Sequence, residues 1–277
     1  MKIQNYLLVL AIFVVTACQT KNRNTIENGI TYATIDVEEN YPLLNNPDNP
    51  NYELKLSFTY PAAYEDEKML GKIQALFLSS FFDETYANYA PGEAMAQYVE
   101  NKQRDYKALE DEFKKRMKKT KSSSLVRFFH HEAISDTVVF NKGGLISFSV
   151  YTEDYTGGAH PNHTLTNRVI DVQRGTFLTE SELFVEDFKD RMAQILVKNL
   201  TAQHELDNPK QLEELGFFDI GKIVPNGNFL LDEKGVTYSF NEYEIAAYSA
   251  GTINVHVTYG EIKHLLRKEN PIRHVAK

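Results

Sequence analysis

The segment from Asp154 to His163 holds the residue types in this sequence that are best suited to chemistry. It reads Asp-Tyr-Thr-Gly-Gly-Ala-His-Pro-Asn-His, so paired glycines stand beside two histidines and a proline. Glycines permit positive φ and close approach of the backbone, and Pro161 restricts the exit of the loop. A loop of this kind, with a histidine among aromatic neighbours, is typical of a recognition site.

Three kinds of function are open to this loop. His160 and His163 could bind a metal, with Asp154, His130 or His131 as a further ligand. His160 could instead be a general base with Asp154 as its partner. The loop could also dock a ligand without catalysis. A purely structural reading has the glycines forming a tight corner that His160 caps.

The spacing of the histidines gives little support to a metal site or to a catalytic role for His160. Two histidines three residues apart in a loop lack the helical geometry and the third ligand of specific zinc motifs. His130 and His131 are adjacent on an expected strand, so they point to opposite faces and do not join one site. No Gly-x-Ser-x-Gly elbow and no phosphate-binding glycine loop accompanies His160. We therefore expect no metal, no cofactor and no catalytic residue, and keep His160 with Asp154 as the catalytic alternative.

A second distinctive segment, residues 240–251, reads Phe-Asn-Glu-Tyr-Glu-Ile-Ala-Ala-Tyr-Ser-Ala-Gly. Glu242 and Glu244 are two residues apart on an irregular segment, and such residues rarely face each other. The aromatic and apolar residues of the segment are expected to be packing anchors. They are Phe240, Tyr243, Ile245 and Tyr248.

Periodicity predicts the elements that position these segments. Alternating or β-rich stretches predict strands at 30–37, 53–60, 126–140, 145–152, 165–172, 229–231, 236–240 and 253–258. Apolar stripes predict helices at 66–82, 91–119, after 180 and at 259–266. The turn at 232–235 predicts a hairpin with Gly235 in the left-handed conformation.

Strands in runs and helices in runs, without regular alternation, indicate an α+β protein with antiparallel sheets and packed helices. We expect two intimately associated subdomains: an N-terminal α+β domain at 30–152 and a C-terminal one at 153–277.

The N-terminus predicts export and lipidation. Lys2 precedes an apolar run at 6–15, which is too short to span a bilayer. The run ends in Val15-Thr16-Ala17-Cys18, which is similar to the lipobox of bacterial lipoproteins. We expect a signal peptide at 1–17, a lipidated Cys18 that anchors the protein to a membrane, and a polar tether at 18–29.

Composition limits the remaining classes. Cys18 is the only cysteine, so an exported chain has no intramolecular disulfide and is stabilised by its core. The 38 acidic residues exceed the 30 basic ones, for a formal charge of −8, and no basic patch is interleaved with aromatics. Nucleic acid is therefore not an expected partner, whereas a cationic partner is compatible with this charge.

The two distinctive segments resemble a family of envelope proteins of unknown function. The motifs are residues 155–162, Tyr-Thr-Gly-Gly-Ala-His-Pro-Asn, and the run around Tyr243-Glu244-Ile245-Ala246. The C-terminal domain of that family is similar to the exported domain of the lysozyme-sensing anti-sigma factor RsiV. Residues 30–152 resemble the companion N-terminal domain, which is also found fused to a peptidoglycan deacetylase. The ligand-binding residues that this resemblance and the loop suggest are Tyr155, Gly157, Gly158, His160, Asn162, Tyr243 and Tyr248.

These observations favour a non-catalytic, lipid-anchored envelope protein that binds a protein or a cell-wall ligand such as peptidoglycan. The resemblance names a lysozyme-like muramidase as a specific partner. The chain has no sigma-binding segment and no deacetylase catalytic domain, so only the binding fold carries over. A hydrolase acting on wall glycan or peptide through His160 is the alternative, and a purely structural envelope protein is a third. Residues 19–23 carry no acidic patch after Cys18, which favours the periplasmic face of the outer membrane.

Overall fold

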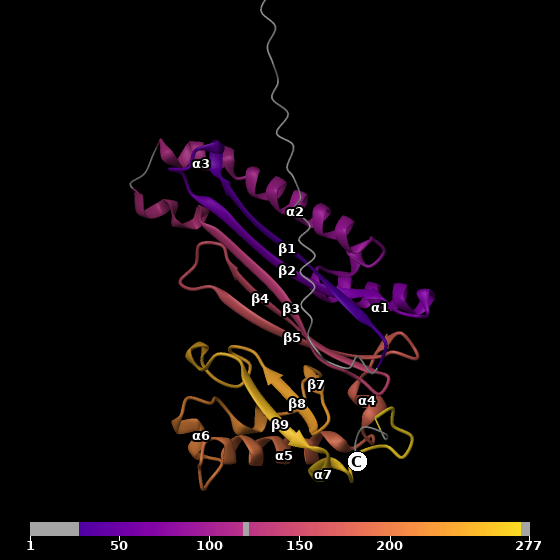
Figure 1. The fold of residues 1–277 in the computed structure, drawn as a ribbon. Coiled ribbons are helices and arrows are strands. Elements are labelled where there is room, and N and C mark those ends of the chain that lie inside the picture. Colours follow the sequence, from indigo (N-terminus) through magenta and orange to yellow (C-terminus); the bar gives the residue numbers. More distant parts are fainter. Residues whose placement is uncertain (1–27, 119–121, 273–277) are drawn as a thin grey trace, which may run out of the picture.

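The computed structural model describes residues 28–118 and 122–272. Cys18, the signal peptide and most of the tether lie outside the described residues. The described residues form two β-sheets with helices packed against both (Figure 1). This confirms the α+β class and the two associated subdomains.

The larger sheet has six strands in the order β1-β2-β3-β4-β5-β6. Its strands are β1 (Thr31–Pro42), β2 (Asn51–Ala63), β3 (His130–Lys142), β4 (Leu145–Tyr155), β5 (Asn162–Asp171) and β6 (Thr176–Phe177). All neighbours are antiparallel except β2 and β3, which run parallel. The expectation of purely antiparallel sheets is wrong for this pair. Parallel neighbours need a long crossover, and the helices between β2 and β3 supply it.

Those helices are α1 (Glu67–Phe81), α2 (Pro91–Lys107) and α3 (Glu110–Met117). Asp66 caps α1 by accepting a hydrogen bond from the amide of Met69 at 3.0 Å, and Pro91 begins α2, where a missing N–H costs nothing. The single helix expected at 91–119 is interrupted at Ala108 and Leu109. The strand expected from residue 126 begins at His130 instead, after a 3-10 helix (Ser122–Phe128).

The smaller sheet has the order β7-β8-β9, all antiparallel, with α5 along it (Figure 1). Its elements are β7 (Phe229–Leu231), β8 (Gly235–Phe240), β9 (Ile253–Thr258), α4 (Glu180–Leu183), α5 (Phe188–Gln203), α6 (Gln211–Glu214) and α7 (Tyr259–Ile262). The hairpin predicted at 232–235 is confirmed, because Leu231 pairs with Val236. Gly235 does not have a positive φ; a side chain there would instead meet the carbonyl oxygen of Val257 at 2.0 Å.

Two cores meet at β4 and β5. On one face, Phe148 of β4 stacks on Phe77 of α1 with ring centroids 4.1 Å apart. On the other face, Leu145 and Val169 pack with the core of the smaller sheet. The six-stranded sheet continues past residue 152 to Phe177, so β4 and β5 serve both subdomains. The domain limits 30–152 and 153–277 stay a prediction.

Buried polar side chains also join the two sheets. Ser147 Oγ donates to the carbonyl oxygen of Leu231 at 2.7 Å, and Asn167 Nδ2 donates to Ser239 Oγ at 2.7 Å. Buried polar groups need such partners, so these bonds fix how the sheets lie on each other. Within the described ranges, no helix has the length and apolar character needed to cross a membrane.

Candidate functional site

The β4–β5 hairpin carries the loop at 156–161, and Gly157 fixes its position. Gly157 has φ +84°, and an ideal Cβ there would lie 2.2 Å from the Cα of Arg127. Only glycine fits both the backbone conformation and this approach. Gly158 has neither feature, since its nearest atom to an added Cβ is the carbonyl oxygen of His160 at 3.8 Å. The predicted role of the glycine pair is confirmed at Gly157 only.

Gly157→Ala is therefore expected to lower the free energy of unfolding by about 2 kcal/mol or more, through positive φ and the backbone clash. That corresponds to a fall in Tm of roughly 4–8 °C for a chain of this size. Gly158→Ala is the matched control and should leave Tm nearly unchanged. Thermal unfolding of the two variants checks this, and equal effects would contradict the assignment.

The segment 241–251 lies against the same hairpin. Asn241 holds it there: its Oδ1 accepts from the amide of Leu165 at 2.8 Å, and its Nδ2 donates to the carbonyl oxygen of Leu165 at 3.2 Å. Tyr248 OH donates to the carbonyl oxygen of Pro161 at 3.1 Å. Residues about 80 positions apart in sequence therefore form one surface.

Aromatic rings cluster where the two segments meet. The rings of His160 and Tyr248 stack with centroids 3.8 Å apart, and Tyr243 OH lies 3.3 Å from His160 Nε2. The centroid of the His163 ring lies 6.0 Å from that of Tyr248 and 6.2 Å from that of Tyr151, and both ring pairs are stacked. We call these five residues, Tyr151, His160, His163, Tyr243 and Tyr248, the tyrosine–histidine surface.

Tyr243 has an unusual backbone for its type. Its φ is 65°, in the left-handed region, and the residue is 56% exposed. This conformation is unfavourable for a residue with a Cβ, and such strain concentrates at functional sites. The expectation that Tyr243 is a packing anchor is wrong, whereas Phe240 and Ile245 are buried as predicted.

Carboxylates and imidazoles alternate beside these rings. His131 lies 3.8 Å from Glu53 and 3.5 Å from Glu153, and His163 lies 3.8 Å from Glu153 and 2.7 Å from Glu242. Cross-strand register produces this row, because Glu53 pairs with His131 and Glu153 with His163. The row brings the three carboxylates Glu53, Glu153 and Glu242 together on this part of the surface.

The acidic surroundings affect the exposed tyrosines. Desolvation and then the Glu242 carboxylate raise the pKa of Tyr248, and desolvation and then Glu153 raise the pKa of Tyr151. Both hydroxyls therefore stay protonated near neutral pH, and that of Tyr248 donates to the carbonyl oxygen of Pro161.

The alternative catalytic pair, His160 with Asp154, is not assembled. His160 Nδ1 lies 2.9 Å from the carbonyl oxygen of Pro161, and Asp154 accepts from Asn162 Nδ2 at 3.3 Å on the other face of the hairpin. Tyr155 lies over the loop and donates to the carbonyl oxygen of Gly158 at 3.0 Å. Of the residues proposed to bind a ligand, His160, Tyr243 and Tyr248 converge, whereas Asn162 points away from them.

The histidines of β3 divide as their alternation predicts. His130 packs edge-on against Tyr52 and Tyr106 on the helix side, and His131 joins the carboxylate row on the opposite side. Across residues 28–118 and 122–272, no group of three or more His, Cys, Asp or Glu side chains has the arrangement of a metal site.

Tyr151 and Glu153 were missed from the sequence. They alternate with Tyr155 along β4, so the three residues share one face of the strand. That period of two was the available signal. The approach of Glu242 to His163 depends on the tertiary fold and has no local signal.

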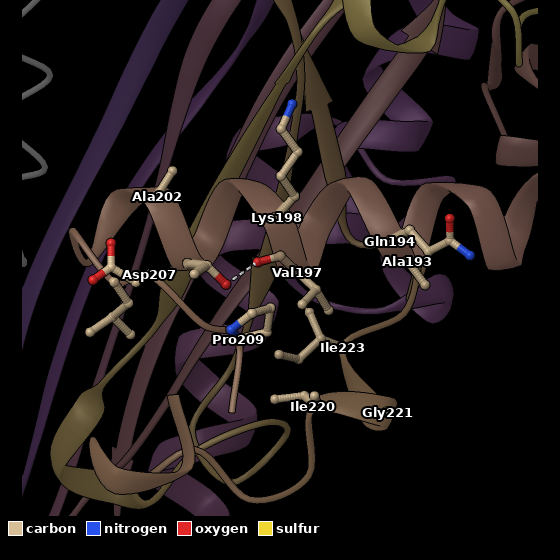
Figure 2. Close-up of a pocket in the computed structure, with 12 residues that line it drawn as sticks. Ala193, Gln194, Val197, Lys198, Ala202, Asp207, Pro209, Ile220, Gly221 and Ile223 are labelled. Atoms are coloured by element: carbon tan, nitrogen blue, oxygen red, sulfur yellow. Dashed lines mark hydrogen bonds between the residues drawn. The ribbon is translucent and has the colours of Figure 1, made fainter. Parts of the chain in front are cut away.

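A cavity of ≈ 620 Å³ lies between α5 and the segment 206–223 (Figure 2). Its walls are mainly apolar, with Val197, Ile220 and Ile223 facing one another. Lys198 points away from it and pairs with Glu261 at 3.6 Å. None of the tyrosine–histidine surface lines this cavity, and its walls bring together no reactive groups, so we place the candidate site on the surface.

Comparisons with known proteins agree with a chain built of two kinds of region. Residues 33–163 match the family described as deacetylase PdaC, and residues 181–260 match a family described as proteins of unknown function, DUF3298. Tyr151, His160 and His163 lie within the first region, and Tyr243 and Tyr248 lie within the second, so the tyrosine–histidine surface combines both.

Solved structures support the same composition. A DUF3298 family member from Bacteroides fragilis is 26% identical, with a TM-score of 0.86, over 91% of this chain and 99% of that chain. A DUF3298 family protein from Pseudomonas aeruginosa is 11% identical, with a TM-score of 0.57, over 85% of this chain and 94% of that chain, and shows the fold alone. A search of curated proteins finds no match.

Proposed function

We propose that this protein is a non-catalytic, lipid-anchored binding protein of the bacterial cell envelope, and that its tyrosine–histidine surface binds a cationic protein. The observation that carries the proposal is Tyr243, an exposed aromatic residue held in the left-handed conformation beside His160 and Tyr248. An exposed side chain adds little to the packing of the core, so the backbone strain at Tyr243 is not explained by stability. Strain of this kind is consistent with selection for recognition.

The chemistry of the surface suits a protein partner. Tyrosines offer large, rigid contact area with a polar end, and they are enriched among residues that dominate binding energy. The carboxylates Glu53, Glu153 and Glu242 add negative charge, which accelerates association with a basic partner. A lysozyme-like muramidase, which is typically cationic, is the specific partner we propose.

The geometry favours binding over hydrolysis through His160. A general base needs an orienting partner and a reacting group within hydrogen-bond reach. The carbonyl oxygen of Pro161 orients Nδ1 of His160, but the Tyr243 hydroxyl lies at its Nε2 and its ring stacks on Tyr248, so both ring nitrogens already have partners. These contacts hold the imidazole within the tyrosine–histidine surface and support the binding function.

The lipid anchor rests on the N-terminal sequence. The apolar run at 6–15 followed by Thr16-Ala17-Cys18 supports lipidation of Cys18, and the lack of acids at 19–23 supports the periplasmic face of the outer membrane. Cys18→Ser is expected to move the protein from the membrane fraction to the soluble fraction, with loss of lipid by mass spectrometry. A variant that stays lipidated would rule out the anchor.

Calorimetric titration of a pure lysozyme into the mature chain tests the binding function. We expect saturable binding at low salt that weakens as salt screens the carboxylates. Tyr248→Ala should weaken it by at least about tenfold, as for a central aromatic contact. Tyr89→Ala, at a tyrosine 38% exposed elsewhere, is the control and should have no effect. No saturable binding at low salt would remove this partner.

A further inference from the structure

Arg168 lies in a second cavity, on the face of β5 opposite His163. The cavity has a volume of ≈ 380 Å³ and is built by segments far apart in the sequence: Glu84, residues 167–169, residues 177–180, and Gly227 with Phe229. This size lies in the range of small-ligand sites. Arg168 faces the helix side of the sheet, whereas the tyrosine–histidine surface lies on the other side.

The guanidinium of Arg168 is positioned but not neutralised. Its Cζ lies 5.6 Å from the centroid of the Phe177 ring, and its Nη1 donates to the carbonyl oxygen of Asn167 at 3.2 Å. Among the described residues it has no ion pair. Burial lowers the pKa of the guanidinium, because lost hydration disfavours its charge. A partly desolvated arginine has several N–H donors in a fixed plane and is suited to a carboxylate.

Two carboxylates line the same cavity. Glu84 is exposed at its rim, and Glu180 accepts from the amide of Gly227 at 3.3 Å. Neither approaches Arg168 within ion-pair distance. A ligand that carried only negative charge would meet these carboxylates unfavourably, whereas one with separate negative and positive ends would match both parts of the cavity.

We propose that this cavity binds a small zwitterion, an amino acid or short peptide, with its carboxylate on Arg168 and its ammonium group towards Glu84 and Glu180. The site is separate from the tyrosine–histidine surface and independent of the function proposed for it.

Calorimetry on the mature chain with three forms of one dipeptide tests the proposal. We expect saturable binding of D-alanyl-D-alanine with both ends free, and at least about tenfold weaker binding of its C-terminal amide and of its N-acetyl form. A parallel titration with L-alanyl-L-alanine distinguishes peptides of the cell wall from peptides of proteins as the source of the ligand. Saturable binding of either dipeptide supports the site.

Variants assign the two ends. Arg168→Gln should weaken binding of the free dipeptide at least about tenfold. Glu84→Gln should reduce the difference in affinity between the free and the N-acetyl dipeptide. Arg174→Gln is the control, since Arg174 already pairs with Asp171 at 2.8 Å and should not affect binding. The proposal is overturned by equal binding of the amide, by unchanged binding in Arg168→Gln, or by no saturation of either dipeptide below about 10 mM. The wild-type titrations decide the outcome even if a variant fails to fold.

Discussion

Tyr243→Asn is expected to make the protein more stable and to weaken partner binding at the same time. Asparagine tolerates positive φ better than tyrosine does, so relief at φ 65° should raise the free energy of unfolding by about 0.5–1 kcal/mol. Tyr243 as a whole residue is 56% exposed, so little packing is lost. Tm should rise by roughly 1–4 °C.

The same substitution removes the hydroxyl beside His160 Nε2 and the ring near Tyr248. We expect affinity for lysozyme to fall at least about tenfold, which is roughly 1.4 kcal/mol. Thermal unfolding and calorimetry on one preparation measure both effects. Tyr89→Asn is the control, since Tyr89 is exposed but has no positive φ. A lower Tm together with unchanged affinity would show that Tyr243 is structural.

Asp136→Asn is expected to stabilise the protein increasingly as the pH rises from 4 to 7. Asp136 is 8% exposed, its Oδ1 accepts from the amide of Thr59 at 2.6 Å, and its Oδ2 is buried without a hydrogen-bond partner. Burial raises the pKa of this carboxyl to about 7. Asparagine keeps the acceptor for Thr59 and carries no charge to bury.

The sign follows from proton binding. Between the ordinary aspartate pKa and about 7, the folded state holds a proton that the unfolded state has lost, so the wild-type free energy of unfolding falls with pH. One such group lowers the free energy of unfolding by about 1.4 kcal/mol per pH unit, or by roughly 4 kcal/mol between the ordinary aspartate pKa and pH 7. Denaturant unfolding of both proteins at pH 4 and pH 8 measures the difference. Asp36→Asn, at an exposed position, is the control. A difference between Asp136→Asn and wild type that does not change with pH would contradict this account.

Local patterns in the sequence predict most individual elements. The stripe that predicts a helix at 66–82 gives α1 at Glu67–Phe81, and alternation at 53–60 lies within β2. The pairing of β2 with β3 is not predictable in this way, because alternation gives the faces of a strand but not its direction relative to a neighbour. The break between α2 and α3 involves no proline or glycine, so no helix-breaking residue marked it.

The candidate site was also partly predictable, because some of its parts have local sequence patterns and others depend on the tertiary fold. The glycine–histidine loop and the segment 240–251 were recognisable because their residue types are unusual. That Tyr248 stacks on His160 could not be predicted, because the contact joins residues 88 positions apart through the packing of two sheets. The exposure of Tyr243 was missed because an aromatic residue beside buried Phe240 and Ile245 is usually packed too.

The measurement that tests the central claim most directly is amide hydrogen exchange of the mature chain with and without saturating lysozyme. We predict slower exchange at 151–163 and 241–251, the two segments that build the tyrosine–histidine surface, with little change in α1 and α2. Protection confined to the helices, or no protection at saturation, would contradict the proposal that this surface is where the protein binds its partner.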